Sequence, residues 1–137
     1  MKGKSTIRVV KLLVQNNNGQ VLAIRRSSTA AVRPLTWDFP GGVIEENESV
    51  VDAAIRETFE ETGLTVVPGE MLDTVSSETT TALVVESIYQ AKSLNSKVIL
   101  STEHDQYFWI ETELLDIENF PAIFHESIMQ LKRRAQK

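Results

Sequence analysis

Three glutamates on one predicted helix are the residues in this chain whose type and spacing best support chemistry. Ser49 is a suitable N-cap and Gly63 a suitable left-handed residue after the last turn, so residues 50–62 are predicted to be helical. At about 100° per residue, Glu57, Glu60 and Glu61 fall within about 100° of one another around the helix axis. Their carboxylates are therefore expected to share one face.

This clustering of negative charge favours the binding of a cation. Like charges at these spacings repel by roughly 0.2–0.5 kcal/mol per pair, and Glu45, Glu46 and Glu48 lie just upstream. Glu60 and Glu61 lie near the C-terminal end of the helix, where the helix dipole disfavours negative charge. Carboxylate oxygens without imidazole or thiolate partners select hard ions such as Mg²⁺ or Mn²⁺. The alternative interpretation is a solvated acidic helix face, which is common in unrelated proteins.

The same periodicity predicts which side of the helix is buried. Val51, Ile55 and Phe59 lie opposite the glutamates and are predicted to face the core. Ala53 and Ala54 lie on the carboxylate side, where their small side chains would leave room for a ligand to approach.

A rigid turn, Phe39-Pro40-Gly41-Gly42, precedes the helix. Two consecutive glycines can adopt positive φ, so the turn can direct a backbone carbonyl toward a metal or backbone N–H groups toward a phosphate. A Pro-Gly-Gly sequence considered alone is equally typical of an ordinary turn.

This window resembles the signature of the Nudix hydrolases, G-x5-E-x7-R-E-U-x-E-E-x-G-U, where U is bulky and apolar. The chain matches the signature at Gly42, Glu48, Arg56, Glu57, Glu60, Glu61, Gly63 and Leu64. It departs at Thr58, which stands at the first apolar position and is expected at the edge of the buried face, where its methyl group can pack. The resemblance implies an α/β (α+β) fold, namely an α/β/α sandwich with a mixed β-sheet.

The resemblance also implies a set of metal ligands, because glutamates of the signature hold divalent ions in that family. Carried over, Glu57 and Glu61 would be the first ligands, with Glu60 close behind and the carbonyl of Gly41 as a backbone ligand. Glu48 would support the loop or join the metal shell through water. The implied cofactor is Mg²⁺, for which Mn²⁺ can substitute.

Three residues are implied to act in the reaction, an in-line attack of water on phosphorus. Arg56 would orient a glutamate by ion pairing, and Glu57 would accept the proton of the attacking water. Glu103 is the alternative proton acceptor, because it lies six residues before Trp109, as a further glutamate often precedes a tryptophan strand in the family. An ordinary loop carboxylate is an equally weighted interpretation of Glu103.

Candidate substrate-binding residues flank the turn. An arginine side chain can bind a phosphate through two hydrogen bonds, and the candidates for this role are Arg25, Arg26 and Arg33. The alternative is that these arginines are solvated charges in loops. The turn itself contributes Gly42, whose backbone can approach a phosphate. Four aromatic residues can stack on a base, with a core position as the alternative for each: Trp37, Phe39, Tyr107 and Phe124.

The implied function is Mg²⁺-dependent hydrolysis of a diphosphate linkage in a nucleoside di- or triphosphate, or in a compound linked to a nucleoside diphosphate. The markers of several subfamilies are absent, and the chain length is closest to the MutT-like nucleotide pyrophosphohydrolases. Hydrolysis of a nucleotide sugar or of an RNA 5′ end is one alternative. A catalytically silent nucleotide-sensing module is another.

The elements that must position these residues follow from periodicity and turn signals. Strands are predicted over residues 6–14 and 20–25, which would form a hairpin through the turn at 16–19. Further strands are predicted over 36–39, 64–77, 81–91 and 107–110, with a closing helix over 121–134. No repeat or linker divides the chain, so residues 1–137 are expected to form a single domain.

The composition and net charge of the chain limit the classes of partner that it is expected to bind. A formal net charge of −5 argues against non-specific nucleic-acid or membrane binding. The absence of cysteine excludes disulfides and thiolate chemistry. With no apolar run near the ~20 residues that a bilayer requires, a cytoplasmic protein with a small nucleotide substrate is expected, as a monomer or homodimer.

Overall fold

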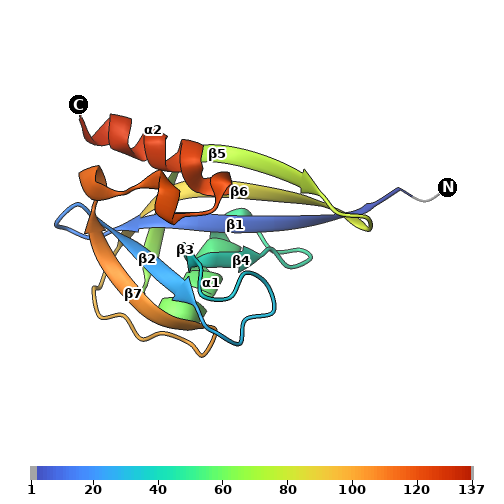
Figure 1. Cartoon of the computed structure of the whole chain (residues 1–137), viewed down its shortest axis with the longest axis horizontal. Helices are drawn as coiled ribbons and strands as arrows, with labels where there is room; N and C mark the ends of the chain where they lie inside the picture. The colour runs from blue at the N-terminus through green and yellow to red at the C-terminus, as the bar shows by residue number, and fades with distance from the viewer. Residues whose placement is uncertain (1–2, 137) are drawn as a thin grey trace.

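The computed structural model describes residues 3–136, and its centre is the long strand β1, Ser5–Gln15 (Figure 1). On one side β1 pairs in parallel with β6, Ala82–Ser93, which pairs antiparallel with β5, Val66–Glu78. On the other side it pairs antiparallel with β4, Gly41–Val43. The β-branched run of β1 suits this central place, since residues 9–14 are all buried.

The predicted hairpin is present but opens beyond its turn. β2, Gln20–Arg26, pairs with β1 only at Gln15 and Val21, next to the turn. It then pairs with β7, His104–Glu111, and with β3, Trp37–Asp38. The mixed sheet therefore has two parts. One contains β4, β1, β6 and β5, the other contains β3, β2 and β7, and they are joined where Gln15 of β1 pairs with Val21 of β2.

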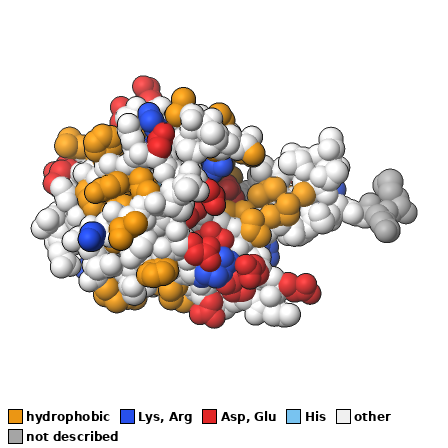
Figure 2. Space-filling model, turned by 90° about the horizontal axis from the view of Figure 1, so that it is seen from below, with side chains coloured by type: hydrophobic (Ala, Val, Ile, Leu, Met, Phe, Trp, Pro, Cys, Tyr) orange, Lys and Arg blue, Asp and Glu red, His pale blue; other side chains and the backbone are white. Residues whose placement is uncertain are grey.

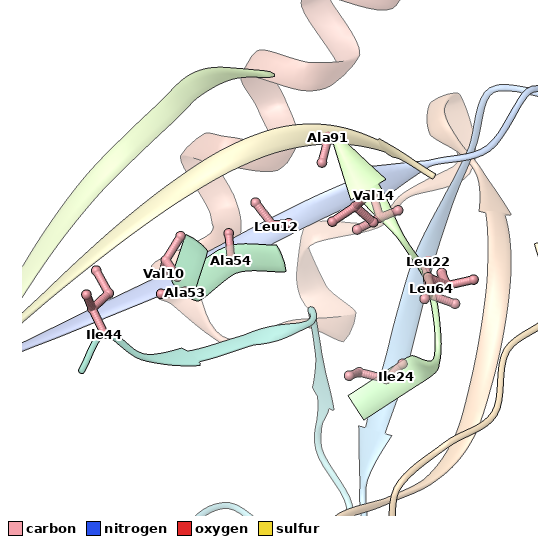
Figure 3. Packing of buried hydrophobic residues seen from close by; sticks show 11 residues of the cluster. Val10, Leu12, Val14, Leu22, Ile24, Ile44, Ala53, Ala54, Leu64 and Ala91 are labelled. Atoms are coloured by element: carbon pink, nitrogen blue, oxygen red, sulfur yellow. The ribbon is translucent and has the colours of Figure 1, made fainter. Parts of the chain in front are cut away.

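Two helices cover opposite faces of the sheet, which confirms the predicted sandwich. α1, Val50–Thr62, packs on the core that contains Val10, Leu12 and Val14 of β1 (Figure 3). α2, His125–Ala135, packs on a second core that contains Leu13. Alternate residues of β1 thus serve opposite layers.

The largest difference from the predicted elements lies between β7 and α2. Three 3₁₀ turns occupy this segment, Thr112–Leu114, Ile117–Asn119 and Ala122–Phe124, so α2 begins later than its apolar pattern predicts. The short strand β4 was not predicted, because a Gly-Gly pair carries no strand periodicity.

The predicted burial of α1 is wrong for Val51 and Phe59, whereas Ile55, the third residue of the predicted face, is half-buried and packs against the core. Val51 is 51% exposed and Phe59 is 59% exposed, whereas Ala53 and Ala54 are fully packed against the sheet. Small residues allow the helix backbone to approach the strands closely, so Ala53 and Ala54 leave no room for a ligand. Thr58 also lies inward and is fully buried.

Within residues 3–136, none of the helices combines the length and the apolar character that crossing a bilayer requires.

Candidate active site

α1 is fixed at both ends, which sets the positions of its glutamates. The Ser49 hydroxyl accepts a hydrogen bond from the Asp52 N–H at 3.0 Å, so the predicted N-cap is confirmed. Gly63 adopts φ +72°, and its N–H donates to the Phe59 carbonyl. This left-handed end is the predicted one.

Both glycines of the turn are required by their surroundings. A Cβ on Gly41, which has φ +147°, would lie 2.0 Å from the Val10 carbonyl oxygen. A Cβ on Gly42 would lie 2.5 Å from a carboxylate oxygen of Glu57. The first glycine therefore allows the turn to join β1, and the second admits the Glu57 carboxylate against the backbone.

Glu61 is the most enclosed carboxylate of the group, with 8% exposure. One of its oxygens accepts a hydrogen bond from the Gly41 N–H at 2.9 Å. Burial raises the pKa of Glu61 to about 8, although the positive charge of Lys11 and the Gly41 hydrogen bond oppose this shift. Glu61 is thus held against the turn, and among residues 3–136 no basic side chain forms an ion pair with it.

Arg56 forms ion pairs with most of the other glutamates in this region. Its guanidinium bonds both oxygens of Glu48, at 2.7 and 2.9 Å, and one oxygen of Glu57, at 3.0 Å. Longer contacts reach Glu45 at 3.6 Å and Glu60 at 3.5 Å. Acidic side chains crowd around basic ones on the face shown in Figure 2. The hydrogen bonds from Arg56 lower the pKa of Glu48 to about 2.

This arrangement corrects one step of the sequence reasoning. Repulsion among the glutamates was expected to require a metal ion, but Arg56 already balances much of the charge. Among residues 3–136, no three acidic or histidine side chains are close enough to hold a metal between them. The donors nevertheless fit Mg²⁺, which takes one or two carboxylates and completes its shell with water and phosphate. Glu57 and Glu61 supply two such carboxylates beside the turn.

Glu57 and Glu103 are the two candidate proton acceptors, and the negative charge of Glu103 acts on Glu57. Burial raises the pKa of Glu57, Arg56 lowers it, and the negative charges of Glu60 and Glu103 raise it further. Glu103 is exposed in the loop before β7, and its carbonyl accepts a hydrogen bond from the Ser27 N–H. Which of the two takes the proton stays a prediction.

The three candidate phosphate-binding arginines differ in their environment. Arg25 is engaged by Asp105 through two hydrogen bonds, at 2.9 and 3.0 Å. Arg26 donates to the Val32 carbonyl at 2.6 Å. Arg33 lies exposed in the loop after β2, with φ +48°. Binding of phosphate by these side chains stays a prediction.

The assignment of Phe39 to substrate binding is contradicted by its position. Phe39 is fully buried, and its ring stacks on Phe120 at 4.7 Å and meets the edge of Phe124 at 4.9 Å. Core packing therefore occupies two of the four candidate stacking residues, Phe39 and Phe124.

An accessible aromatic pair lies nearby, on the two strands that flank β2. The Trp37 and Phe108 rings are 5.4 Å apart, and Phe108 is 56% exposed. They line a cavity of about 260 Å³ together with Asn119 and Leu114.

A buried ion pair that was not predicted from the sequence lies beside the turn. Lys11 and Asp38 approach to 3.0 Å, with side chains 9% and 3% exposed. A single lysine in the apolar run VVKLLV was the available signal, since a buried lysine normally requires a partner.

Comparison with known proteins agrees with this geometry. The family profile described as NUDIX domain matches residues 5–130. The crystal structure of a MutT protein from Methanosarcina mazei Go1 superposes with a TM-score of 0.85 at 33% identity, covering 100% of both chains. A MutT-like protein of Streptomyces ambofaciens is 32% identical over 98 residues, which are 72% of this chain and 59% of the relative.

Other matches cover a smaller part of the chain and include much longer proteins. The m7GpppN-mRNA hydrolase of Danio rerio is 42% identical over 62 residues, which are 45% of this chain and 21% of the relative. The chain therefore spans about a fifth of the length of the curated mRNA hydrolases that it matches.

Proposed function

The chain belongs to the Nudix family, and from this premise we propose that it hydrolyses a diphosphate linkage in a nucleoside di- or triphosphate, or in a compound linked to a nucleoside diphosphate, with Mg²⁺. One observation carries the proposal: the carboxylates of Glu57 and Glu61 both lie directly against the Gly41–Gly42 turn. Acidic oxygens and backbone polar groups thus converge where a diphosphate and its cation can be bound together.

Glu57, Glu61 and the Gly41 carbonyl would hold the cation, with Glu60 available at the exposed rim. When bound, Mg²⁺ neutralises charge on the phosphate oxygens and makes a bound water more acidic. The buried position of Glu61 suits this role, because an incoming cation would stabilise its ionised form.

The other residues would act by holding a neighbouring side chain in place or by accepting a proton. Arg56 fixes one oxygen of Glu57 and leaves the other facing Gly42. Glu48 holds the other edge of the Arg56 guanidinium and also accepts from the Glu45 N–H, so it supports the loop. Glu57 would take the proton of the attacking water, with Glu103 as the alternative.

The cavity at Trp37 and Phe108 supports a substrate that carries a planar base. Trp37 is four residues from Gly41, so the two Cα atoms are at most about 14 Å apart along an extended chain. An aromatic surface at this distance is within reach of the base of a bound nucleotide. Sequence-tolerant stacking of this kind contributes about 1–3 kcal/mol per base.

Hydrolysis of an RNA 5′ end is the second candidate. Similarity to an m7GpppN-mRNA hydrolase and to an RNA pyrophosphohydrolase from Bartonella bacilliformis favours it. The net charge of −5 opposes tight binding of a long polyanion.

The test is a substrate panel with purified protein and Mg²⁺. It contains (d)NTPs, nucleotide sugars, dinucleoside polyphosphates and 5′-triphosphate or capped RNA. We expect EDTA-sensitive cleavage between phosphorus atoms of a free nucleotide, and Glu61→Gln should lower turnover by about 100-fold or more while remaining folded. Wild-type turnover in Glu61→Gln would remove Glu61 from the site. No cleavage across the panel would favour a nucleotide sensor.

A further inference from the structure

The buried pair Lys11–Asp38 stands at the junction between the sheet and the turn. Lys11 lies on β1 directly opposite Gly41 of β4 in the antiparallel pairing. Burial lowers the pKa of Lys11, but attraction to Asp38 and then to Glu61 outweighs this effect and leaves the pKa raised. Both partners are therefore charged in an environment where isolated charges are unfavourable, so the pair requires an explanation.

The pair fixes both backbone polar groups of Phe39, its N–H and its carbonyl. The Lys11 ammonium donates to the Phe39 carbonyl at 3.3 Å, and the Asp38 carboxylate accepts from the Phe39 N–H at 2.8 Å. The next carbonyl, of Pro40, accepts from the Leu12 N–H at 2.8 Å. The next N–H, of Gly41, donates to Glu61. Successive backbone groups leading into the turn are thus each held by a different partner.

We propose that Lys11 and Asp38 are positioning residues, which fix the backbone of Phe39 and thereby place the Gly41 backbone against Glu61. The inference rests on the proposed function, since it assigns the pair to the same metal-binding turn. Replacing a residue that orients a metal ligand without itself binding the metal typically lowers metal affinity or activity by about 10- to 100-fold.

A purely structural role makes a different prediction. Replacing a buried ion pair by apolar residues of similar volume is often neutral or stabilising, whereas removing one partner alone is strongly destabilising. The double variant Lys11→Met/Asp38→Leu therefore separates the two roles, because it removes both charges together. Asp38→Asn is the second variant, since its side-chain oxygen can still accept from the Phe39 N–H.

We expect the double variant to unfold at or above the wild-type denaturant midpoint, while its kcat falls by about 10- to 100-fold with KM unchanged. Mn²⁺ affinity, measured by calorimetry without substrate, should weaken by a similar factor. Asp38→Asn should show a smaller loss in both quantities. The matched control is Lys132→Met, because Lys132 donates to the Leu115 carbonyl at 2.7 Å in another part of the fold. This control should keep wild-type kcat and Mn²⁺ affinity.

Wild-type kcat and Mn²⁺ affinity in a normally stable double variant would overturn the proposal. A change confined to KM would also overturn it and would point to Arg26, whose guanidinium lies 3.6 Å from Asp38. If the double variant does not fold, wild-type behaviour of Asp38→Asn in both measurements counts against the proposal. Because Mn²⁺ binding needs no turnover, the pair can be tested even if the wild-type protein hydrolyses nothing in the substrate panel.

Discussion

Neighbouring glutamates of the signature differ in charge state because their surroundings differ. Glu48 contacts the Arg56 guanidinium with both oxygens, which keeps its pKa near 2. Glu61 is enclosed between α1 and the turn, and burial raises its pKa to about 8. The sequence identified both residues through their spacing. It could not distinguish their environments, because the burial of Glu61 depends on how α1 packs against the turn and against Lys11 of β1.

The raised pKa of Glu61 predicts an unusual pH dependence of stability in the metal-free protein. The folded protein retains a proton on Glu61 that the unfolded chain releases near its ordinary pKa of 4.5. The retained proton makes a contribution to the stability of the folded protein. This contribution is fully present below pH 4.5 and is lost as the pH rises through about 8. The free energy of unfolding should therefore fall with a slope of up to ~1.4 kcal/mol per pH unit.

The measurement is urea unfolding of EDTA-treated wild type and Glu61→Gln at several pH values within this window. The difference between the two proteins isolates Glu61, since other titrating groups are common to both. We expect this difference to shrink once Mg²⁺ is added. Parallel pH profiles without metal would show that Glu61 is ionised normally.

Gly42 offers a second test at the level of one residue. In Gly42→Ala, the new methyl group would lie 2.5 Å from the Glu57 carboxylate, so that carboxylate must move. A displacement of about 1 Å can lower activity by about 100-fold, so we expect a loss of that order in kcat/KM. Gly3→Ala is the control, because nothing lies within 4 Å of its added Cβ. Equal activity in the two variants would contradict the placement of Glu57.

Among the elements, α1 shows which features a sequence pattern can predict and which it cannot. Its ends were predicted correctly, because caps depend on neighbouring residues such as Ser49 and Gly63. Its buried side was predicted wrongly at Val51 and Phe59, because the whole apolar stripe, of which Ile55 alone packs against the core, was assumed to face inward. Contact with the sheet instead selects small side chains, and this preference depends on how closely the two layers approach.

The orientation of α1 predicts opposite sensitivities on its two sides. Ala54→Leu adds volume between helix and sheet and should lower the free energy of unfolding by about 1–3 kcal/mol. Phe59→Ser changes an exposed residue and should alter it by no more than ~0.5 kcal/mol. Urea unfolding of both variants measures the difference. A large loss in Phe59→Ser with a small loss in Ala54→Leu would mean that the apolar stripe is buried after all.

At the scale of the whole molecule, the order of strands and helices predicted the sandwich, but not the division of its sheet. The hairpin turn at 16–19 was evident from its asparagines and glycine. The separation of β1 from β2 was not, because it follows from the pairing of β4 with the same edge of β1, and a Gly-Gly pair carries no strand signal. The Trp37 cavity was equally hidden, since it combines β3, β7 and the 3₁₀ segment.

This cavity predicts how substrate binding responds to mutation. Loss of one stacking partner should weaken base binding by about 1–3 kcal/mol, so Trp37→Ala should raise KM by about tenfold or more with little change in kcat. Tyr107→Ala is the comparison, because Tyr107 is also exposed but does not line the cavity. A larger rise in KM for Tyr107→Ala would place the base on the other side of the strand.

The turn that faces the proposed cation is itself part of the central sheet. The Leu12 N–H binds the carbonyl of Pro40 just before β4, and the Ile44 N–H just after it binds the carbonyl of Arg8, both at 2.8 Å. Amide hydrogens in this segment should therefore exchange with solvent only when the core itself opens. Heat or denaturant should then abolish ligand binding and tertiary structure in one step, without a folded intermediate that lacks the site.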